Sequence, residues 1–249
     1  MKPTFLYHLL TLALLLCGMV MPSLQAQPYK NPSLSPEERT ADLLQRMTLE
    51  EKIAQIRHIH SWNIFEEQEL NKSKLQEFVG DLCWGFVEGF PLTGENCHRH
   101  MRHIQEYMLN HTRLGIPIFT VAEALHGSVH EGSTIYPQNI ALASTFNPEL
   151  AYLRATEISK ELHYQGINQI LAPCIDVVRD LRWGRIEESY GEDPYLNGIF
   201  AYKEAKGYLD NGISPMLKHY GAHGNPLGGL NLASVHCGIG ELHDVYLQP

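Results

Sequence analysis

A lysine and a histidine that stand side by side at the start of a glycine-rich loop are the first side chains here that could do chemistry. The apolar run 213–217 leads directly into Lys218 and His219. Four glycines and a proline follow within the next twelve residues, and such a stretch is neither regular helix nor regular strand. Lys and His donate hydrogen bonds of the kind that bind neutral polyols. Taken alone, such a pair is more often part of the solvated surface. A functional interpretation is favoured here because polar clusters also follow two earlier strand-like apolar runs.

A carboxylate follows the first of those earlier runs. Residues 118–122 predict a buried strand, and Glu123 comes directly after them in the string E-A-L-H-G. A carboxylate at a strand end can accept hydrogen bonds from two adjacent hydroxyl groups of a sugar. Two other interpretations stay open at this point, a helix N-cap and an ion pair.

The third polar cluster follows the apolar run 167–172. It extends over residues 173–194 and contains three arginines, a tryptophan and several carboxylates between glycines. Arg185 could donate its planar pair of N–H groups to hydroxyls, and Trp183 could either stack on a sugar face or pack the loop. The alternative is a network of Arg, Asp and Glu that stiffens a long loop. We expect most members to do that, with one or two reaching a ligand.

The elements that must position these clusters are strands that alternate with helices. Helical segments come first, and strand and helix then alternate about four times, which predicts a parallel sheet covered by helices. A closed (β/α)8 barrel needs eight strands and roughly 250 residues. The predicted fold class is therefore α/β, an incomplete (β/α)8 TIM-like barrel. The expected strands are 83–90, 118–122, 167–172 and 213–217. Two helices are expected to follow capping boxes at Ser35 and Thr48. Further helices are expected over 67–79, 95–112, 147–164 and 193–209, and a last one begins at Glu241.

Composition excludes several classes of partner and cofactor. The 249 residues carry a net charge of −9, so nucleic acid and anionic membranes are not expected partners. The cysteines of the mature chain are widely spaced, without a C-x-x-C pair, which disfavours a zinc site. Three histidines within 98–103 fit a solvated helix face better than a metal site, so no metal and no cofactor are expected. Disulfide pairing and oligomeric state stay open.

The N-terminus is typical of an export signal. Lys2 is followed by the almost wholly apolar run 9–21, and small residues around Ala26 predict cleavage after that position. The run is too short to span a bilayer comfortably, although an uncleaved anchor is the alternative. We expect a secreted or periplasmic protein with a signal peptide over 1–26, a linker over 27–35, a barrel domain over 36–249, and no membrane span after cleavage.

The three clusters together resemble a known family. The string R-D-L-R-W-G-R-I-E-E-S-Y-G-E-D-P-Y-L, which begins at Arg179, is similar to the R-D-P-R-W-G-R…E-x-x-G-E-D-P signature of glycoside hydrolase family 3. The strings K-H-Y-G-A-H-G from Lys218, E-A-L-H-G from Glu123 and M-T-L-E-E-K-I-A-Q from Met47 resemble three further motifs of that family. The resemblance covers nearly all of 36–249, and its motifs are long and specific.

The resemblance implies a retaining exo-β-glycosidase acting on a β-linked oligosaccharide or glycoside, in which an Asp nucleophile attacks the anomeric carbon and a second carboxylic acid protonates the leaving oxygen. Carried over by motif position, Glu123, Arg185, Lys218 and His219 would bind the non-reducing terminal sugar. The form of the motifs favours a β-glucosidase that releases terminal β-D-glucose. A β-xylosidase of the same family is the alternative, and a metal-dependent hydrolase is the weakest interpretation.

Two departures from the family pattern limit the expected activity. Leu230 stands where the family usually has Arg. The S-D-W-type motif that carries the family's nucleophile does not occur in these residues. We therefore expect a C-terminally truncated fragment that lacks nucleophile and acid/base and does not hydrolyse glycosides by itself. If the chain truly ends at Pro249, a non-catalytic sugar-binding remnant is the alternative, which the exposed edge of an open half-barrel disfavours.

Overall fold

The computed structural model describes residues 27–88 and 93–249. The expected signal peptide, residues 1–26, lies outside the described residues, as do the last two residues of the strand expected over 83–90. The chain divides into two compact units, 1–52 and 53–249.

In the first unit both predicted capping boxes are confirmed. The Ser35 hydroxyl accepts from the backbone N–H of Glu38, whose carboxylate accepts from the Ser35 N–H in return, and Thr48 and Glu51 exchange the same pair of bonds. These bonds satisfy N–H groups that have no partner inside the helix. Within the segment expected as a linker, Tyr29 is buried. The unit contains η1 (Pro28–Lys30), α2 (Pro36–Arg46) and the start of α3 (Leu49–Gln55).

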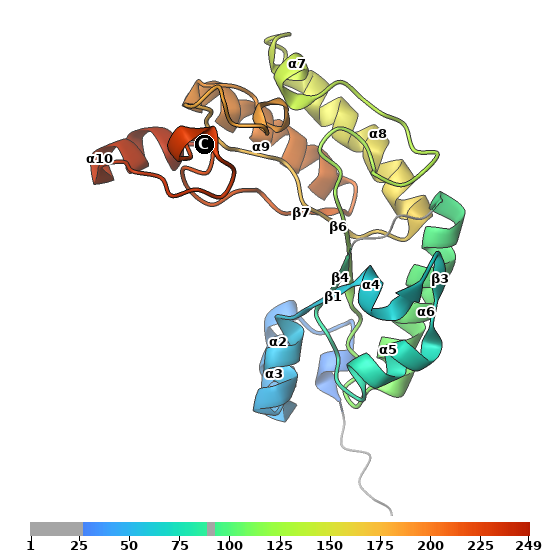
Figure 1. Ribbon diagram of the computed structural model, residues 1–249. Coiled ribbons are helices and arrows are strands. Elements are labelled where there is room, and N and C mark those ends of the chain that lie inside the picture. The colour runs from blue at the N-terminus through green and yellow to red at the C-terminus, as the bar shows by residue number, and fades with distance from the viewer. Residues whose placement is uncertain (1–26, 89–92) are drawn as a thin grey trace, which may run out of the picture. The chain divides into compact units, whose positions relative to one another are not determined.

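The second unit is built on a sheet of five parallel strands in the order β1-β4-β5-β6-β7 (Figure 1). All four predicted strands are present, although the paired residues are fewer than the apolar runs that predicted them. β1 was not predicted, because its central Ile59 lies between two histidines and so makes no apolar run. The α/β fold with an incomplete barrel sheet is confirmed. The strands are β1 (His58–His60), β4 (Phe86–Glu88), β5 (Phe119–Ala122), β6 (Gln169–Ile170) and β7 (Ser214–Pro215).

One predicted helix begins later than expected. The segment 67–79 was expected to be helical throughout, but the helix starts only at Lys72, because Asn71 caps it by accepting from the backbone N–H of Lys74 at 3.0 Å. The residues before it form a short antiparallel hairpin. The elements here are α4 (Ser61–Ile64), β2 (Phe65–Glu66), β3 (Glu69–Leu70) and α5 (Lys72–Val79).

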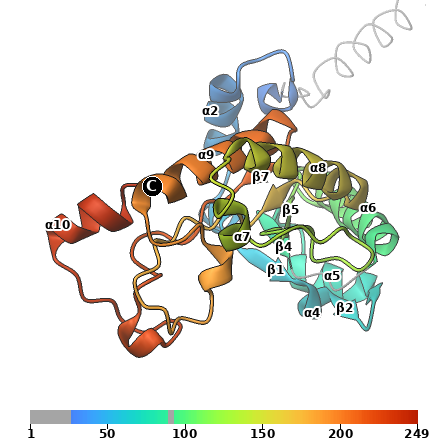
Figure 2. The ribbon, with the colours of Figure 1, turned by 90° about the horizontal axis from the view of Figure 1, so that it is seen from above.

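Three long helices lie along one side of the sheet (Figure 2). They are α6 (Gly94–His111), α8 (Glu149–Gln165) and α9 (Pro194–Asp210). Gly166 in the left-handed conformation ends α8, as predicted, and Asp193 caps α9 by accepting from the N–H of Leu196 at 2.7 Å. Shorter elements complete the unit: α7 (Asn139–Ala143), η2 (Ile186–Glu188), η3 (Leu227–Gly229), α10 (Ile239–Glu241) and η4 (Leu242–Tyr246).

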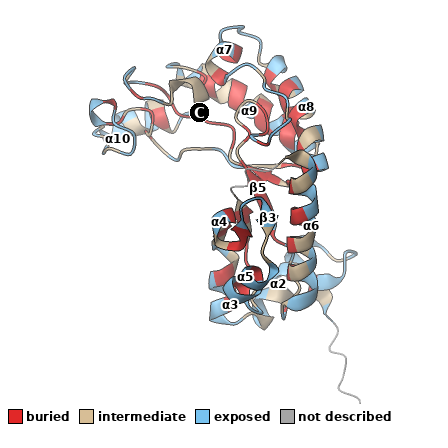
Figure 3. Ribbon diagram, turned by 45° about the vertical axis from the view of Figure 1, so that its right-hand side comes forward, coloured by how far each residue is buried: buried red, intermediate tan, exposed pale blue. Residues whose placement is uncertain are grey.

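The core lies between the strands and these helices. Buried residues gather on β5 and along α6, α8 and α9 (Figure 3). Full burial of one aliphatic side chain stabilises the fold by about 1.5–3 kcal/mol. At Gly207 of α9 an added Cβ would lie 2.7 Å from the backbone oxygen of Tyr152, so glycine lets α9 approach α8 closely. The main core includes Ile59, Val87, Ile104, Ile158, Leu162, Ile170 and Tyr208.

Across residues 27–88 and 93–249, the structure contains no helix with the length and apolar character needed to cross a bilayer.

Candidate functional site

The carboxyl ends of the parallel strands bring the predicted polar clusters to one edge of the sheet. Glu123 follows β5 directly, and Lys218 stands three residues after β7. Beyond β6, Cys174 forms a parallel bridge with Lys218, and the N–H of Ile175 donates to the Lys218 carbonyl at 2.6 Å. Because parallel strands run in the same direction, residues that follow them meet at the same edge.

Lys218 and Glu123 form an ion pair across this edge. The Lys218 ammonium donates to both carboxylate oxygens of Glu123, at 3.0 and 2.8 Å, and lies 3.7 Å from a carboxylate oxygen of Glu188. The side chain of Lys218 is only 11% exposed. Its charge is therefore held in place by two carboxylates. Of the two alternatives left open for Glu123, the ion pair is the one that the structure contains.

Arg185 and Glu188 form a second, bidentate pair. The Arg185 Nε and Nη2 donate to the two carboxylate oxygens of Glu188 at 2.6 and 2.7 Å. Burial alone raises the pKa of Glu188, but the hydrogen bonds and charge of Arg185, with help from Lys218, outweigh it and hold that pKa below its ordinary value. Glu188 is thus an ionised acceptor at neutral pH, and it fixes the plane of the Arg185 guanidinium.

These two pairs line one pocket. The pocket has a volume of about 600 Å³, which lies within the roughly 300–1,000 Å³ of typical small-molecule sites. Its charged lining consists mainly of two cations and their carboxylate partners, so it offers both donors and acceptors to a neutral ligand. The lining residues are Glu123, Leu125, His126, Gly127, Ser128, Val129, His130, Glu131, Gly132, Ser133, Ile135, Arg185, Glu188 and Lys218.

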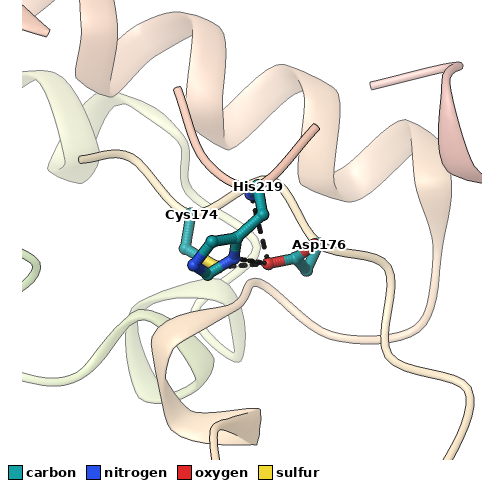
Figure 4. A group of neighbouring side chains, drawn as sticks. All are labelled: Cys174, Asp176 and His219. Atoms are coloured by element: carbon teal, nitrogen blue, oxygen red, sulfur yellow. Dashed lines mark hydrogen bonds and ion pairs between the residues drawn. The ribbon is translucent and has the colours of Figure 1, made fainter. Parts of the chain in front are cut away.

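His219 is held by a buried carboxylate beside the pocket (Figure 4). The His219 Nδ1 lies 2.5 Å from Asp176 Oδ2, and the backbone N–H of His219 donates to the same oxygen at 3.3 Å. The Cys174 thiol donates to it at 3.2 Å. Burial, reinforced by the charge of Asp176, raises the pKa of Cys174 well above its ordinary value, so the sulfur stays a protonated donor.

The same three side chains have ligand atoms close enough together to suggest a cation site. Two ligands on a tetrahedral cation with bonds of about 2.0 Å stand about 3.3 Å apart. His219 Nδ1 and Asp176 Oδ2 are only 2.5 Å apart, which is a hydrogen-bond distance. The arrangement fits a hydrogen-bonded cluster rather than a metal centre.

Comparison with known proteins assigns the family. Residues 48–249 match the glycosyl hydrolase family 3 N terminal domain. The chain belongs to glycosyl hydrolase family 3. This confirms the resemblance drawn from the motifs.

Several family-3 relatives cover most of this chain. A putative beta-xylosidase of Formosa agariphila is 34% identical over 90% of the chain and 32% of its own length, and a periplasmic beta-glucosidase of Salmonella typhimurium is 31% identical over 92% and 29%. A solved beta-glucosidase structure from Erythrobacter marinus matches with a TM-score of 0.82 at 29% identity over 90% of this chain and 31% of its own. The beta-glucosidase of Listeria innocua in complex with glucose matches at 0.72 and 30% over 86% and 31%. The chain spans about a third of the length of these relatives.

Three of the four predicted site residues line this one pocket. Glu123, Arg185 and Lys218 face the same cavity, whereas His219 is joined to Lys218 by a cis peptide bond and is not among the described residues that line it. Trp183 is 1% exposed and donates to the Asn231 side chain at 3.1 Å, so it packs the loop and does not stack on a ligand. The expected stiffening network is confirmed where Arg182 pairs with Asp180, outside the pocket.

Two carboxylates that hold site residues were not predicted: Asp176 is hydrogen-bonded to His219, and Glu188 pairs with Arg185. Asp176 and Glu188 both lie in the cluster that follows β6, but that cluster contains other Asp and Glu residues as well. The available signal was their position: Asp176 stands a few residues after a strand end. The pairing with His219 across 43 residues is set by the fold.

A buried ion pair is linked by hydrogen bonds to the pocket residue Glu188. The Arg154 guanidinium donates to Glu204 at 2.7 Å and to the side-chain oxygen of Asn139 at 2.5 Å. The Asn139 amide donates in turn to the backbone carbonyl of Glu188 at 2.6 Å, and Tyr190 donates to Glu204. Burial favours a neutral Arg154, but Glu204 more than compensates and raises the pKa of Arg154. The segment that carries Glu188 is therefore tied to the α8–α9 contact.

A chain of hydrogen bonds between neutral groups holds the part of the pocket lining that contains Ser128 and His130. His130 lies 3.2 Å from the Cys97 sulfur through Nε2 and 2.7 Å from the Ser128 hydroxyl through Nδ1, and Ser128 donates to Gln165 at 2.6 Å. Burial raises the pKa of Cys97 to about 12 and lowers that of His130 to about 4. Both groups are neutral at pH 7, so Cys97 is no thiolate nucleophile, and the cluster serves to hold the pocket wall.

Proposed function

We propose that this chain supplies the binding site for the terminal non-reducing sugar in a family-3 β-glycosidase. The observation that carries the proposal is the convergence of Glu123, Arg185 and Lys218 on one pocket at the carboxyl edge of the sheet. A charge-paired donor and acceptor set of this kind suits the vicinal hydroxyls of a sugar ring. We add His219 as a fourth sugar-binding residue because it adjoins Lys218 in the chain, although it is not among the described residues that line the pocket.

In the proposed reaction these residues bind and orient the sugar, and other groups make and break bonds. Retaining glycosidases need a nucleophilic carboxylate and an acid/base carboxyl about 5–5.5 Å apart, flanking the scissile bond. We place both groups outside these 249 residues, because the chain spans about a third of its relatives. Hydrogen bonds from Arg185, Lys218 and His219 accelerate hydrolysis where they tighten as the ring approaches the oxocarbenium-like transition state.

The substrate we favour is a β-glucoside. The Glu123 motif and the A-H-G form of the Lys218 loop favour the β-glucosidase branch, and the solved relatives named above are beta-glucosidases. A β-xylosidase is the alternative, supported by the relative from Formosa agariphila. Residues 1–26 have the pattern of a signal peptide, and one relative is periplasmic, which supports a secreted or periplasmic location. A non-catalytic sugar-binding remnant is the second alternative.

The purified chain is expected to bind D-glucose weakly, with a dissociation constant on the order of 1 mM, and to leave an aryl β-glucoside intact. Lys218→Met removes a charged donor, and the loss of a hydrogen bond to a charged group costs about 1.5–3 kcal/mol, so glucose affinity should fall at least about tenfold. Titration by NMR measures the affinity, and release of the aryl alcohol measures hydrolysis.

Lys160→Met is the matched control, because Lys160 pairs with Glu157 on the exposed face of α8 and lies outside the pocket. It should bind glucose as the unmodified chain does. Hydrolysis by the chain alone would disprove the missing-nucleophile proposal. Equal affinity in the Lys218 and Lys160 variants would disprove the assignment of the pocket.

A further inference from the structure

Asp176 is a deeply buried carboxylate beside the pocket, and it makes none of the proposed sugar contacts. It is 3% exposed. Its Oδ2 accepts from the His219 ring at 2.5 Å, from the His219 backbone N–H at 3.3 Å, and from the Cys174 thiol at 3.2 Å. Two of these three bonds go to one residue, so a single carboxylate oxygen fixes both the main chain and the imidazole of His219.

We infer that Asp176 is a positioning residue for His219, which it orients so that the second ring nitrogen meets a sugar hydroxyl. The inference rests on the proposed function, because that proposal gives His219 its ligand. Asp176 itself touches no sugar in this account and acts only through the histidine.

The hydrogen bond decides which ring nitrogen is available. An imidazole that donates Nδ1–H to a carboxylate is held in one tautomer and one orientation. Nε2 is then left for the ligand, as an acceptor in the neutral ring and as a donor in the imidazolium. In Figure 4 this nitrogen points away from Asp176. The His219 side chain is 28% exposed, so the ring is accessible to a ligand.

The surroundings of the pair favour a positioning role over a purely stabilising one. Asp176 Oδ1 is buried without a hydrogen-bond partner among the described residues, and a buried polar atom in that state costs about 1–3 kcal/mol. The Cys174 thiol stays protonated. It therefore donates a hydrogen bond to Asp176 and does not replace Asp176 as the hydrogen-bond acceptor of the His219 ring. The His223 ring, whose centroid lies 4.2 Å from that of His219, limits movement on another side.

The test is NMR of the 249-residue chain labelled with ¹⁵N in its histidine rings, with the His219 signals assigned from their loss in His219→Gln. The unmodified chain should show His219 protonated on Nδ1, with a strongly deshielded proton, because the bond is short and charge-assisted. In Asp176→Asn the acceptor is neutral, so that proton should move toward the ordinary range. D-glucose affinity should fall about tenfold, as expected for one misplaced hydrogen bond.

Asp180→Asn is the matched control, since Asp180 lies on the same segment but pairs with the exposed Arg182. It should change neither the His219 signals nor glucose affinity. Unprotonated Nδ1 in the unmodified chain overturns the inference, and this measurement does not require a variant to fold. Unchanged His219 signals in the Asp176→Asn variant also overturn it. If the unmodified chain shows the deshielded proton but binds no glucose, the sugar-site proposal fails while the positioning of His219 by Asp176 stands.

Discussion

Replacing Arg154 with Met is expected to lower the free energy of unfolding of the chain by about 3–5 kcal/mol, the usual cost of removing one partner of a buried ion pair. Both side chains of the pair are almost inaccessible to solvent. The substitution would leave the Glu204 carboxylate without its cation and Asn139 without one of its donors. Equilibrium unfolding in urea, followed by circular dichroism, measures the change.

The double variant Arg154→Met, Glu204→Leu is expected to recover most of that loss, because a buried ion pair can be exchanged for apolar residues of similar volume at little cost. Lys206→Met is the matched control, since Lys206 pairs with Asp210 on the exposed side of the same helix. It should leave the unfolding free energy unchanged. A loss below about 1 kcal/mol in the single variant would mean that the pair does not hold α8 and α9 together.

Acidification is expected to destabilise the chain through His130. Its pKa is about 4 in the folded state because of burial, against an ordinary value of 6.5. Between pH 6.5 and 4 His130 takes up a proton in the unfolded chain but stays neutral in the folded chain. The free energy of unfolding therefore falls as the pH falls through this window. A difference of about 2.5 pKa units corresponds to about 3 kcal/mol. Above pH 6.5 the group contributes no pH dependence.

His130→Gln separates this contribution from that of the carboxylates. The variant loses the Cys97 and Ser128 contacts, so it should be less stable than the unmodified chain at pH 7. Between pH 6.5 and 4 the unfolding free energy of the variant should nevertheless fall by about 3 kcal/mol less than that of the unmodified chain. Parallel curves for the two proteins in this window would show that His130 is not a neutral buried group.

Much of the architecture could be predicted from local patterns. The apolar runs before Glu123 and Lys218 marked β5 and β7, because strands of parallel sheets are typically short apolar runs, although the two residues of β7 are only half-buried. The capping residues Ser35 and Asp193 marked helix starts, because the partner of each cap lies three residues away. Each of these signals lies within a few neighbouring residues. β1 lacks such a signal because His58 and His60 flank its single buried residue.

The partners of the site residues could not be predicted in the same way. Lys218 and Glu123 stand 95 residues apart, and Arg154 and Glu204 stand 50 apart. Which carboxylate meets which cation follows from strand order and helix packing. Trp183 illustrates the same limit: its type suits both stacking and packing, and only the fold places it in the interior of its loop.

A crystal structure of the chain soaked with D-glucose tests the central claim most directly. The account predicts one glucose in the pocket, with hydroxyl groups within about 3 Å of the Glu123 carboxylate and of the Lys218 and Arg185 nitrogens. The His219 Nε2 should lie at the same distance from a hydroxyl. Glucose bound elsewhere, or in the pocket without contact to these residues, would contradict the account.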